Sequence, residues 1–262
     1  MMTVREAAHA GSFYPDDGDL LAAEIACWLM NTPQLERMPK ALIVPHAGYQ
    51  YSGEVAAAGY AQLKGRAQQI RTVLLLGPNH RVPLHGLALP TCELFSTPLG
   101  QLLLDRAALA LLATSEWAEW HDEAHRLEHG LEVQLPFLQL SLQKFEIVPV
   151  VVGEIPAATL AALLEPFWHD PSCLIVVSSD LSHFESYPIA QRHDQQTVAQ
   201  ILSKSMQLQG ADACGCRAIN GLMALLQGQK AEISLLAQCN SGDSTGDKNR
   251  VVGYASFAVY AP

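Results

Sequence analysis

Short runs of consecutive apolar residues alternate along this chain with longer segments in which apolar residues recur at helical spacing. The apolar runs lie at residues 41–44, 73–76, 147–152 and 174–177, and a further one lies near the C-terminus at 251–260. Apolar runs without polar alternation are typical of strands that are covered on both faces of a sheet. The pattern therefore predicts a strand at each of these positions.

Helices are predicted between the strands. Residues 19–30 show helical spacing that ends at Asn31, Thr32 and Pro33, and an alanine-rich stretch at 53–63 separates the first two strands. Similar patterns recur at 101–113, 131–142, 156–168, 188–204 and 213–227. The order strand, helix, strand predicts an α/β fold, a three-layer α/β/α sandwich around a mainly parallel or mixed sheet. Because no linker or internal repeat divides the chain, we interpret residues 1–262 as a single domain.

Composition narrows the functional classes. The chain has 262 residues, 49% hydrophobic and 16% charged, which is enough apolar material for a packed core and excludes general disorder. Sixteen Lys and Arg against 26 Asp and Glu give a net charge of −10, without a basic run, which disfavours nucleic acid and anionic lipid as partners. No segment resembles a signal peptide or a membrane span, so we expect a cytoplasmic protein.

The strongest chemical signal is a histidine after each of three predicted strands. His46 follows the first strand, His80 the second and His183 a later one. The carboxyl ends of strands in an open α/β sheet face a shared crevice, so these three imidazoles are expected to converge. Neutral imidazole suits zinc, copper and iron(II). The sequence thus predicts a metal site, although a single histidine in such a loop more often bonds a neighbouring backbone group.

Acidic residues accompany these histidines. Asp180 precedes His183 by three residues, where it can orient a ligand histidine, act as a general base or cap the next helix. His129 and Glu132 share one face of a predicted helix, a spacing that supplies two ligands or a ligand and a base. Acidic residues at this place are equally typical of a helix N-terminus.

Two further residues and one cysteine pair have weaker signals. Tyr49 lies close after His46 and is expected to line the pocket with its hydroxyl or simply to pack, and Asn79 immediately precedes His80. The pair Cys214 and Cys216 has no second cysteine pair beside it, which favours a structural role.

Several motifs together resemble those of the Memo family. They are AGSFYP (10–15), PHAGY (45–49), GPNH (77–80), EHGLEVQLPFL (128–138), VVSSDLSHF (176–184) and NSGDSTGDKNRVVGYAS (240–256). The resemblance spans essentially the whole chain, in the same order. Bacterial and archaeal members of that family are described as component B of the AmmeMemoRadiSam system. The resemblance implies a fold akin to the class III extradiol dioxygenases, with their non-haem iron(II) site.

The resemblance also implies a set of ligands. The family's metal-pocket histidines match His46, His80 and His183, and in animal members a cysteine near the C-terminus completes the pocket. This sequence departs there, because Ser244, beside Asp243, falls at or next to that position and Cys239 falls several residues earlier. A site without a thiolate offers only nitrogen and oxygen ligands, which are harder than sulfur. This makes iron(II) the expected ion, with zinc or copper as alternatives.

Two functions follow as expectations. The first is a metalloenzyme, dioxygenase-like or redox, in which His183, Asp180 and His129 take the catalytic roles and His46, His80, His183, Asp243 or Ser244 hold the metal. The second is a non-enzymatic protein that binds a metal, a small molecule, a peptide or a partner protein. The resemblance further implies a link to a radical-SAM protein and an AMMECR1-like protein.

Overall fold

The computed structural model describes residues 2–65 and 67–261. Within these residues the main sheet has nine strands in the order β10, β12, β2, β9, β3, β8, β4, β7, and β11 also pairs with β12. The strands are β2 (Ala41–Val44), β3 (Thr72–Pro78), β4 (Leu87–Leu89), β7 (Ala118–Trp120), β8 (Glu146–Val152), β9 (Cys173–Ser178), β10 (His183–Glu185), β11 (Glu232–Asn240) and β12 (Val251–Tyr260). The sheet is mixed, because β2, β9, β3 and β8 are parallel whereas β12 and β4 are antiparallel to their neighbours β2 and β8.

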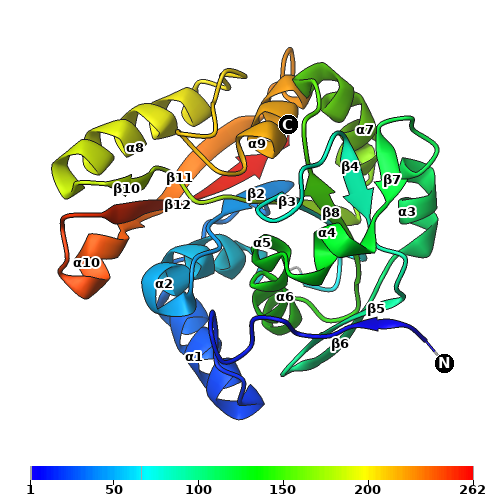
Figure 1. Cartoon of the computed structure of the whole chain (residues 1–262), viewed down its shortest axis with the longest axis horizontal. Coiled ribbons are helices and arrows are strands. Elements are labelled where there is room, and N and C mark those ends of the chain that lie inside the picture. Colours follow the sequence, from blue (N-terminus) through cyan, green and yellow to red (C-terminus); the bar gives the residue numbers. More distant parts are fainter. Residues whose placement is uncertain (1, 66, 262) are drawn as a thin grey trace.

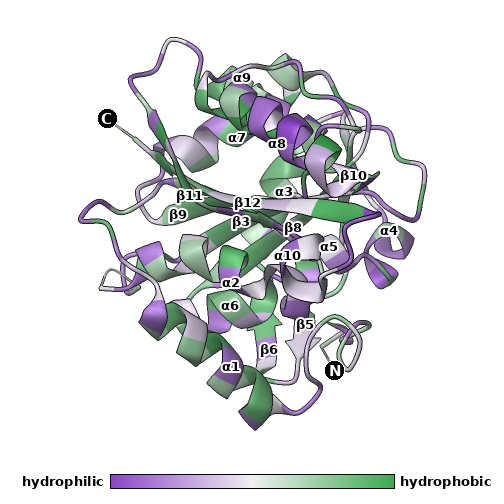
Figure 2. Ribbon diagram, turned by 90° about the vertical axis from the view of Figure 1, so that its left-hand side faces the viewer, coloured by the Kyte–Doolittle hydropathy of each residue, from purple (hydrophilic) through white to green (hydrophobic). Residues whose placement is uncertain are grey.

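Helices cover both faces of this sheet (Figure 1). Figure 2 shows α7 (Ala157–His169), α8 (Tyr187–Leu202) and α9 (Cys216–Leu225) on one face, and α1 (Gly18–Asn31), α2 (Tyr49–Tyr60) and α6 (Leu135–Ser141) on the other. The predicted three-layer α/β/α sandwich is therefore confirmed. The shorter helices are α3 (Arg106–Leu112), α4 (Asp122–Arg126), α5 (His129–Glu132), α10 (Ser241–Thr245) and the 3-10 helix η1 (Ala61–Leu63).

A second, three-stranded sheet lies beside the α1 layer. It consists of β1 (Val4–Arg5), β5 (Leu94–Thr97) and β6 (Gly100–Leu103), in the order β1, β5, β6. The predicted helix at 101–113 was wrong in its first part, because residues 100–103 pair with β5 as an antiparallel hairpin and the helix begins only at Arg106. The predicted helix at 131–142 is divided into α5 and α6.

The central strands are level at their carboxyl ends, and this positions the functional site. Val44 of β2 is opposite Ser178 of β9, and Leu76 of β3 is opposite Val177 of β9. All residues of β2 and β9 are buried between the helical layers. The segments that follow β2, β3 and β9 therefore leave the sheet side by side. Among the described residues, no helix is long and apolar enough to cross a membrane.

Candidate metal centre

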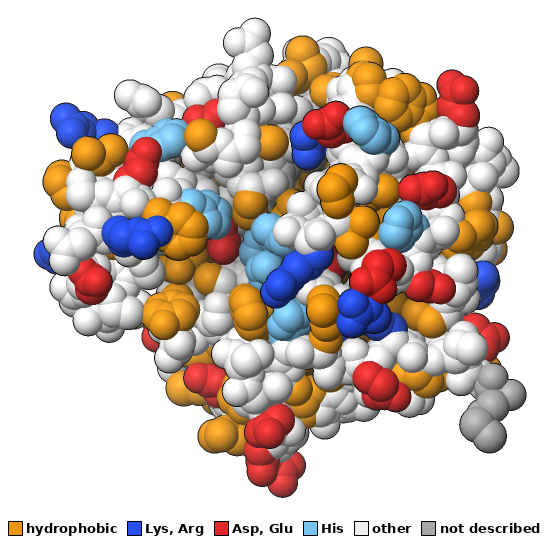
Figure 3. All heavy atoms as spheres, viewed as in Figure 1, with side chains coloured by type: hydrophobic (Ala, Val, Ile, Leu, Met, Phe, Trp, Pro, Cys, Tyr) orange, Lys and Arg blue, Asp and Glu red, His pale blue; other side chains and the backbone are white. Residues whose placement is uncertain are grey.

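Three histidines meet at the carboxyl edge of the sheet. One ring nitrogen of each of His46, His80 and His129 lies within 4.8 Å of the others. His80 stacks on His129 with ring centroids 4.4 Å apart, and the His46 ring is nearly perpendicular to both. Histidine side chains are also seen to gather near the centre of one face of the molecule (Figure 3). These three side chains therefore line a common crevice, reached from β2, β3 and the start of α5.

The tautomer of His46 follows from the hydrogen bonds of Ser178. The Ser178 hydroxyl donates its one proton to the carbonyl oxygen of Gly130, 2.5 Å away, so it accepts from its two other neighbours. Those neighbours are Nε2 of Gln134 and Nδ1 of His46, each at 2.8 Å. Nδ1 of His46 is thus the protonated nitrogen, and the lone pair of Nε2 faces the Cys214 thiol, 3.2 Å away. A Cβ at Gly130 would lie 3.1 Å from Oε1 of Glu128, a tight contact that glycine avoids.

Glu128 fixes His80 in the same way. Its carboxylate accepts from Nδ1 of His80 at 2.8 Å and from the His80 backbone N–H at 2.9 Å, so Nε2 of His80 is left unprotonated. Burial tends to raise the pKa of Glu128, but its hydrogen bonds with His80 and Gly130 outweigh this and lower the pKa to about 2. A carboxylate that orients an imidazole from behind is a frequent companion of metal-binding histidines.

His129 packs between the other histidines and the N-terminal segment. Its ring lies 4.6 Å from the Phe13 ring and 5.7 Å from the His9 ring. Nδ1 of His129 is buried and has no hydrogen-bond partner among the described residues, although Oε1 of Glu128 lies 3.6 Å away. Burial, together with the neighbouring His46 and His80 rings, lowers the pKa of His129 to about 3. Burial, followed by the effect of His80, also lowers the pKa of His46 to about 3, so both rings are neutral near pH 7.

Cys214 reaches the crevice as well, which the sequence analysis missed. Its Sγ lies 3.2 Å from Nε2 of His46 and accepts from the backbone N–H of Asp180 at 3.2 Å. The loop approaches β9 closely because residue 215 is glycine, where a Cβ would lie 2.8 Å from the Ser178 carbonyl oxygen. In the sequence, Gly215 beside Cys214 was the signal that could have indicated this close approach. The expectation of a structural role for this pair did not include the contact with His46.

Asp180 and His183 lie next to the three-histidine group without joining it. Oδ1 of Asp180 accepts the backbone N–H of His46 at 2.7 Å, so this carboxyl holds the His46 backbone, whereas Ser178 holds the His46 ring. Burial raises the pKa of Asp180. Nδ1 of His183 donates to the carbonyl oxygen of Leu181 at 2.8 Å, which leaves its Nε2 free.

Glu132 is fully engaged by the N-terminal segment. Its carboxylate forms an ion pair with Arg5 and accepts from the Tyr14 hydroxyl at 2.6 Å and from the backbone N–H groups of Ala8 and His9 at 3.0 and 2.8 Å. Burial tends to raise the pKa of Glu132, and Arg5 and Tyr14 lower it to below its usual value. This residue therefore anchors the segment that covers His129.

The two other predicted pocket residues form local contacts. Asn79 donates to the carbonyl oxygen of Val82 at 3.0 Å and so shapes the loop that presents His80. The Tyr49 hydroxyl donates to the carbonyl oxygen of Val133 at 2.7 Å, and its ring packs on Phe137. Both side chains support the elements around the crevice.

The predicted C-terminal ligands lie in a different setting. Asp243 accepts from the backbone N–H of Asn240 at 3.0 Å and from the Tyr187 hydroxyl at 2.6 Å. Ser244 is exposed, and its hydroxyl donates to the carbonyl oxygen of Ser241. Cys239, Asp243 and Ser244 all line a groove beside α1 and α2. None of the three belongs to the histidine group.

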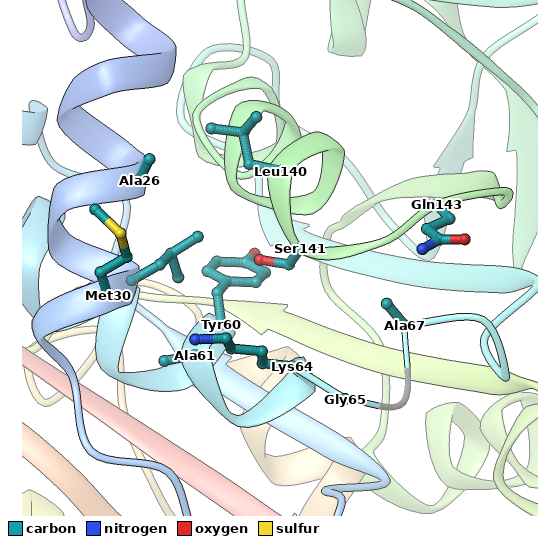
Figure 4. Close-up of a pocket in the computed structure, with 11 residues that line it drawn as sticks. Ala26, Met30, Tyr60, Ala61, Lys64, Gly65, Ala67, Leu140, Ser141 and Gln143 are labelled. Carbon is teal, nitrogen blue, oxygen red and sulfur yellow. The ribbon is translucent and has the colours of Figure 1, made fainter.

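An apolar pocket lies apart from this chemistry. Figure 4 shows it between α1, η1 and α6, with Met30, Leu140 and Lys64 among its lining residues. The volume of the pocket is about 400 Å³. No histidine lines it. The chemically reactive side chains and this apolar hollow are therefore separate features.

The fold and the site together define an α/β sandwich protein with a histidine-lined crevice at its strand ends. Comparisons with known proteins agree with this class. The family described as "Memo-like protein" matches residues 5–258. The chain belongs to the Memo family.

Individual relatives come from archaea and from animals. "MEMO1 family protein TV1383" of Thermoplasma volcanium is 33% identical over 98% of both chains. "Protein memo-1 homolog" of Caenorhabditis elegans is 37% identical over 69% of this chain and 53% of its own. The chain is also similar to the crystal structure of uncharacterized protein JW3007 from Escherichia coli K12, with a TM-score of 0.51 and 14% identity. The match covers 85% of this chain and 100% of the JW3007 chain. This last likeness is one of fold.

Proposed function

We propose that the crevice binds one transition-metal ion through His46, His80 and His129, with the thiol of Cys214 as an additional donor. The observation that carries the proposal is the grouping of three imidazoles, of which His46 and His80 have their Nδ1 protons bound from behind. Unprotonated imidazole nitrogens that converge are the ligands that such ions prefer.

The residues fit a metal ion in two further respects. Nδ1 of His129 is a buried polar atom that receives no hydrogen bond within the described part of the chain, a situation that costs about 1–3 kcal/mol unless a bound group relieves it. Glu128 supplies a negative charge behind His80, which makes the imidazole a better donor. Both features support a site for a cation.

Iron(II) is the ion we propose. The sequence argument for iron depended on the absence of a thiol, and Cys214 weakens that argument, because sulfur also suits copper(I) and zinc. Three imidazoles and the buried carboxyl of Asp180 nevertheless outnumber the single sulfur near the crevice, and they suit iron.

Iron bound in the crevice would supply redox and Lewis-acid chemistry to a small molecule. The surrounding residues would handle protons. Asp180, whose pKa is raised by burial, can hold or release a proton, and Nε2 of His183 can accept one. On these grounds we propose a metal-dependent oxidoreductase of the dioxygenase-like class.

Metal analysis of untagged protein, purified without oxygen, tests the proposal. We expect about one iron ion per chain in the unchanged protein, and none in a variant with both His46→Ala and His80→Ala. A variant with His85→Ala and His169→Ala, two exposed histidines elsewhere, serves as the matched control and should keep its metal. Equal, substoichiometric metal in all three proteins would contradict the proposal, and zinc or copper alone would contradict the choice of iron.

Cobalt(II) binding tests the role of the thiol separately. We expect the absorption that arises from sulfur bound to cobalt in the unchanged protein and its loss in Cys214→Ser, while the weaker visible bands of the cobalt ion persist. Cys216→Ser, two residues away, is the control. Sulfur absorption that persists without Cys214 would exclude this residue as a donor.

A further inference from the structure

A groove of about 940 Å³ runs between strand β11 and helices α1 and α2. On the strand side it is lined by the four consecutive residues 236–239. The pairing of β11 with β12 shifts register between Leu235 and Ala237 and is regular again from Ala237 to Cys239. Successive side chains of this regular part point to opposite faces of the sheet, so a hollow that touches all three residues lies along the edge of the strand. The groove therefore exposes the backbone edge of β11.

This edge of β11 has no partner strand in the part of the chain that the structure describes. β11 pairs with β12 on one side, and among the described residues the backbone of 233–239 forms no hydrogen bond to any other segment. Figure 2 shows β11 near the viewer at one side of the sheet, with α1 and α2 below it. Unpaired N–H and C=O groups along such an edge are a template for an added strand.

Two helix faces form the other wall of the groove. α2 contributes residues 51, 54, 55 and 58, and α1 contributes residues 24, 27, 28 and 31. Each set follows helical spacing, so each is one face of its helix. Among these residues are Trp28, Tyr51 and Val55, which offer apolar contacts. A strand added to β11 would thus place every second side chain against these two faces.

The charge of the groove is negative. Glu24, Glu54 and Asp243 line it, and no Lys or Arg of residues 2–65 and 67–261 does. Glu24 and Glu54 form no ion pair among the described residues. Burial, followed by Asp243 and Glu54, raises the pKa of Cys239 to about 11, so these carboxylates act across the groove on β11. A second copy of this chain, with its net charge of −10, would bring like charges to the same edge.

We infer that the β11 edge binds an extended, basic segment of another protein as an added strand, with its Lys or Arg side chains directed to Glu24 and Glu54. The inference goes beyond the metal centre and does not depend on it, because none of the three clustered histidines lines the groove.

A blocked synthetic octapeptide of alternating lysine and valine is the probe, and calorimetry on the full chain is the measurement. We expect saturable binding of this peptide. A peptide of the same sequence that is N-methylated at alternate residues keeps its charge but cannot pair along one edge, and it should not bind. A version with glutamate in place of lysine should also fail. Equal binding of the N-methylated peptide would overturn the inference, because charge alone would then explain the binding.

Variants locate the interaction. Glu54→Lys should weaken binding of the lysine peptide by about fivefold or more. Glu119→Lys on β7, at the opposite edge of the sheet, is the matched control and should bind as the unchanged protein does. Binding should also be unchanged in the His46→Ala, His80→Ala variant, so failure of the metal proposal is distinguishable from failure here. No binding of the peptide, or light scattering that shows a dimer which the peptide does not dissociate, would overturn the inference.

Discussion

The histidine crevice and the segment Asn240–Thr245 both gather polar side chains at the end of a strand, yet they use them differently. In the crevice, Ser178 and Glu128 bind the outer ring nitrogens of His46 and His80, and the inner nitrogens face the crevice, where the Cys214 thiol contacts that of His46. In the C-terminal segment, Asp243 and Asn240 bind each other's backbone as a capping box at the start of α10.

The difference shows how a ligand side chain is recognised. A side chain becomes available to an ion when its other polar atoms have partners and one lone pair has none. Both carboxylate oxygens of Asp243 already accept a hydrogen bond, one from Asn240 and one from Tyr187. Removing these hydrogen bonds one at a time should therefore weaken metal binding in the histidine crevice, but should lower only stability in the segment Asn240–Thr245.

Replacing Glu128 with Gln should have the largest effect. The carboxylate accepts three N–H groups, two from His80 and one from Gly130, and an amide has only one oxygen with which to replace it. An amide N–H facing Nδ1 of His80 would also favour the tautomer that protonates Nε2. We expect metal affinity to fall by about 10- to 100-fold in a competition titration with a coloured chelator. The control is Glu123→Gln, an exposed carboxylate paired with Arg126, and an equal loss in both variants would contradict this account.

Replacing Ser178 with Ala should have the next largest effect. The change removes the acceptor for His46 and for Gln134, both of which are buried. We expect a loss of about 1–3 kcal/mol in the free energy of unfolding, measured with urea, and about tenfold weaker metal binding. Ser182→Ala is a matched control, because the Ser182 hydroxyl is buried without a partner. Metal binding that survives Ser178→Ala unchanged would show that the His46 tautomer does not depend on this hydroxyl.

Replacing Asp243 with Ala tests the other region of the comparison, the segment Asn240–Thr245. The variant loses the capping box of α10 and should be destabilised by about 1 kcal/mol, with metal binding unaffected. Urea unfolding and metal analysis on the same sample measure both quantities, with Ser244→Ala as the control for a change in the exposed neighbour. Loss of metal in Asp243→Ala would instead support the ligand role that the sequence suggested.

His193 should give the smallest effect, and one that depends on pH. Its ring joins Asp212, two residues before Cys214, to Glu185, two residues after His183. The hydrogen bond to Asp212, and then that to Glu185, raises the pKa of His193. A raised pKa stabilises the fold below the unfolded value of about 6.5, and this stabilisation is lost as the pH rises through the higher folded value.

The free energies of unfolding of the unchanged protein and of His193→Gln should therefore differ at pH 6, by less than about 1 kcal/mol because the ring is partly exposed, and converge at higher pH. His169→Gln, which alters an exposed pair with Glu165, is the control and should show no such pH dependence. A difference that grows with pH would have the wrong sign for this explanation.

The sheet and two of the three clustered histidines could be predicted from the sequence for a simple geometric reason. His46 and His80 each lie two residues beyond the end of a strand, and the strands are neighbours of β9 whose ends are level. His183 lies five residues beyond β9, and the position two residues beyond it is Asp180. Asp180 therefore occupies the place beside His46 that the sequence analysis gave to His183.

The other contacts depend on packing that no local pattern records. Cys214 precedes α9, and only the close approach of Gly215 to β9 brings its thiol to His46. Glu132 shares a helix with His129, as the sequence predicted, but Arg5 and Tyr14 come from the distant N-terminus to engage it. The relation to the extradiol dioxygenases, and the identity of the metal, stay predictions.

Cys214 and His46 are separated by 168 positions in the chain, and His80 and His129 lie between them. A contact between residues so far apart closes a long loop, which costs conformational entropy and slows folding. During synthesis, the first two hundred residues emerge without the thiol that touches His46. The four side chains that line the crevice are therefore all present only once residue 214 has been made, and β11 and β12 of the sheet follow later still. A metal ion that uses the thiol as well as the imidazoles would bind only after this point of synthesis.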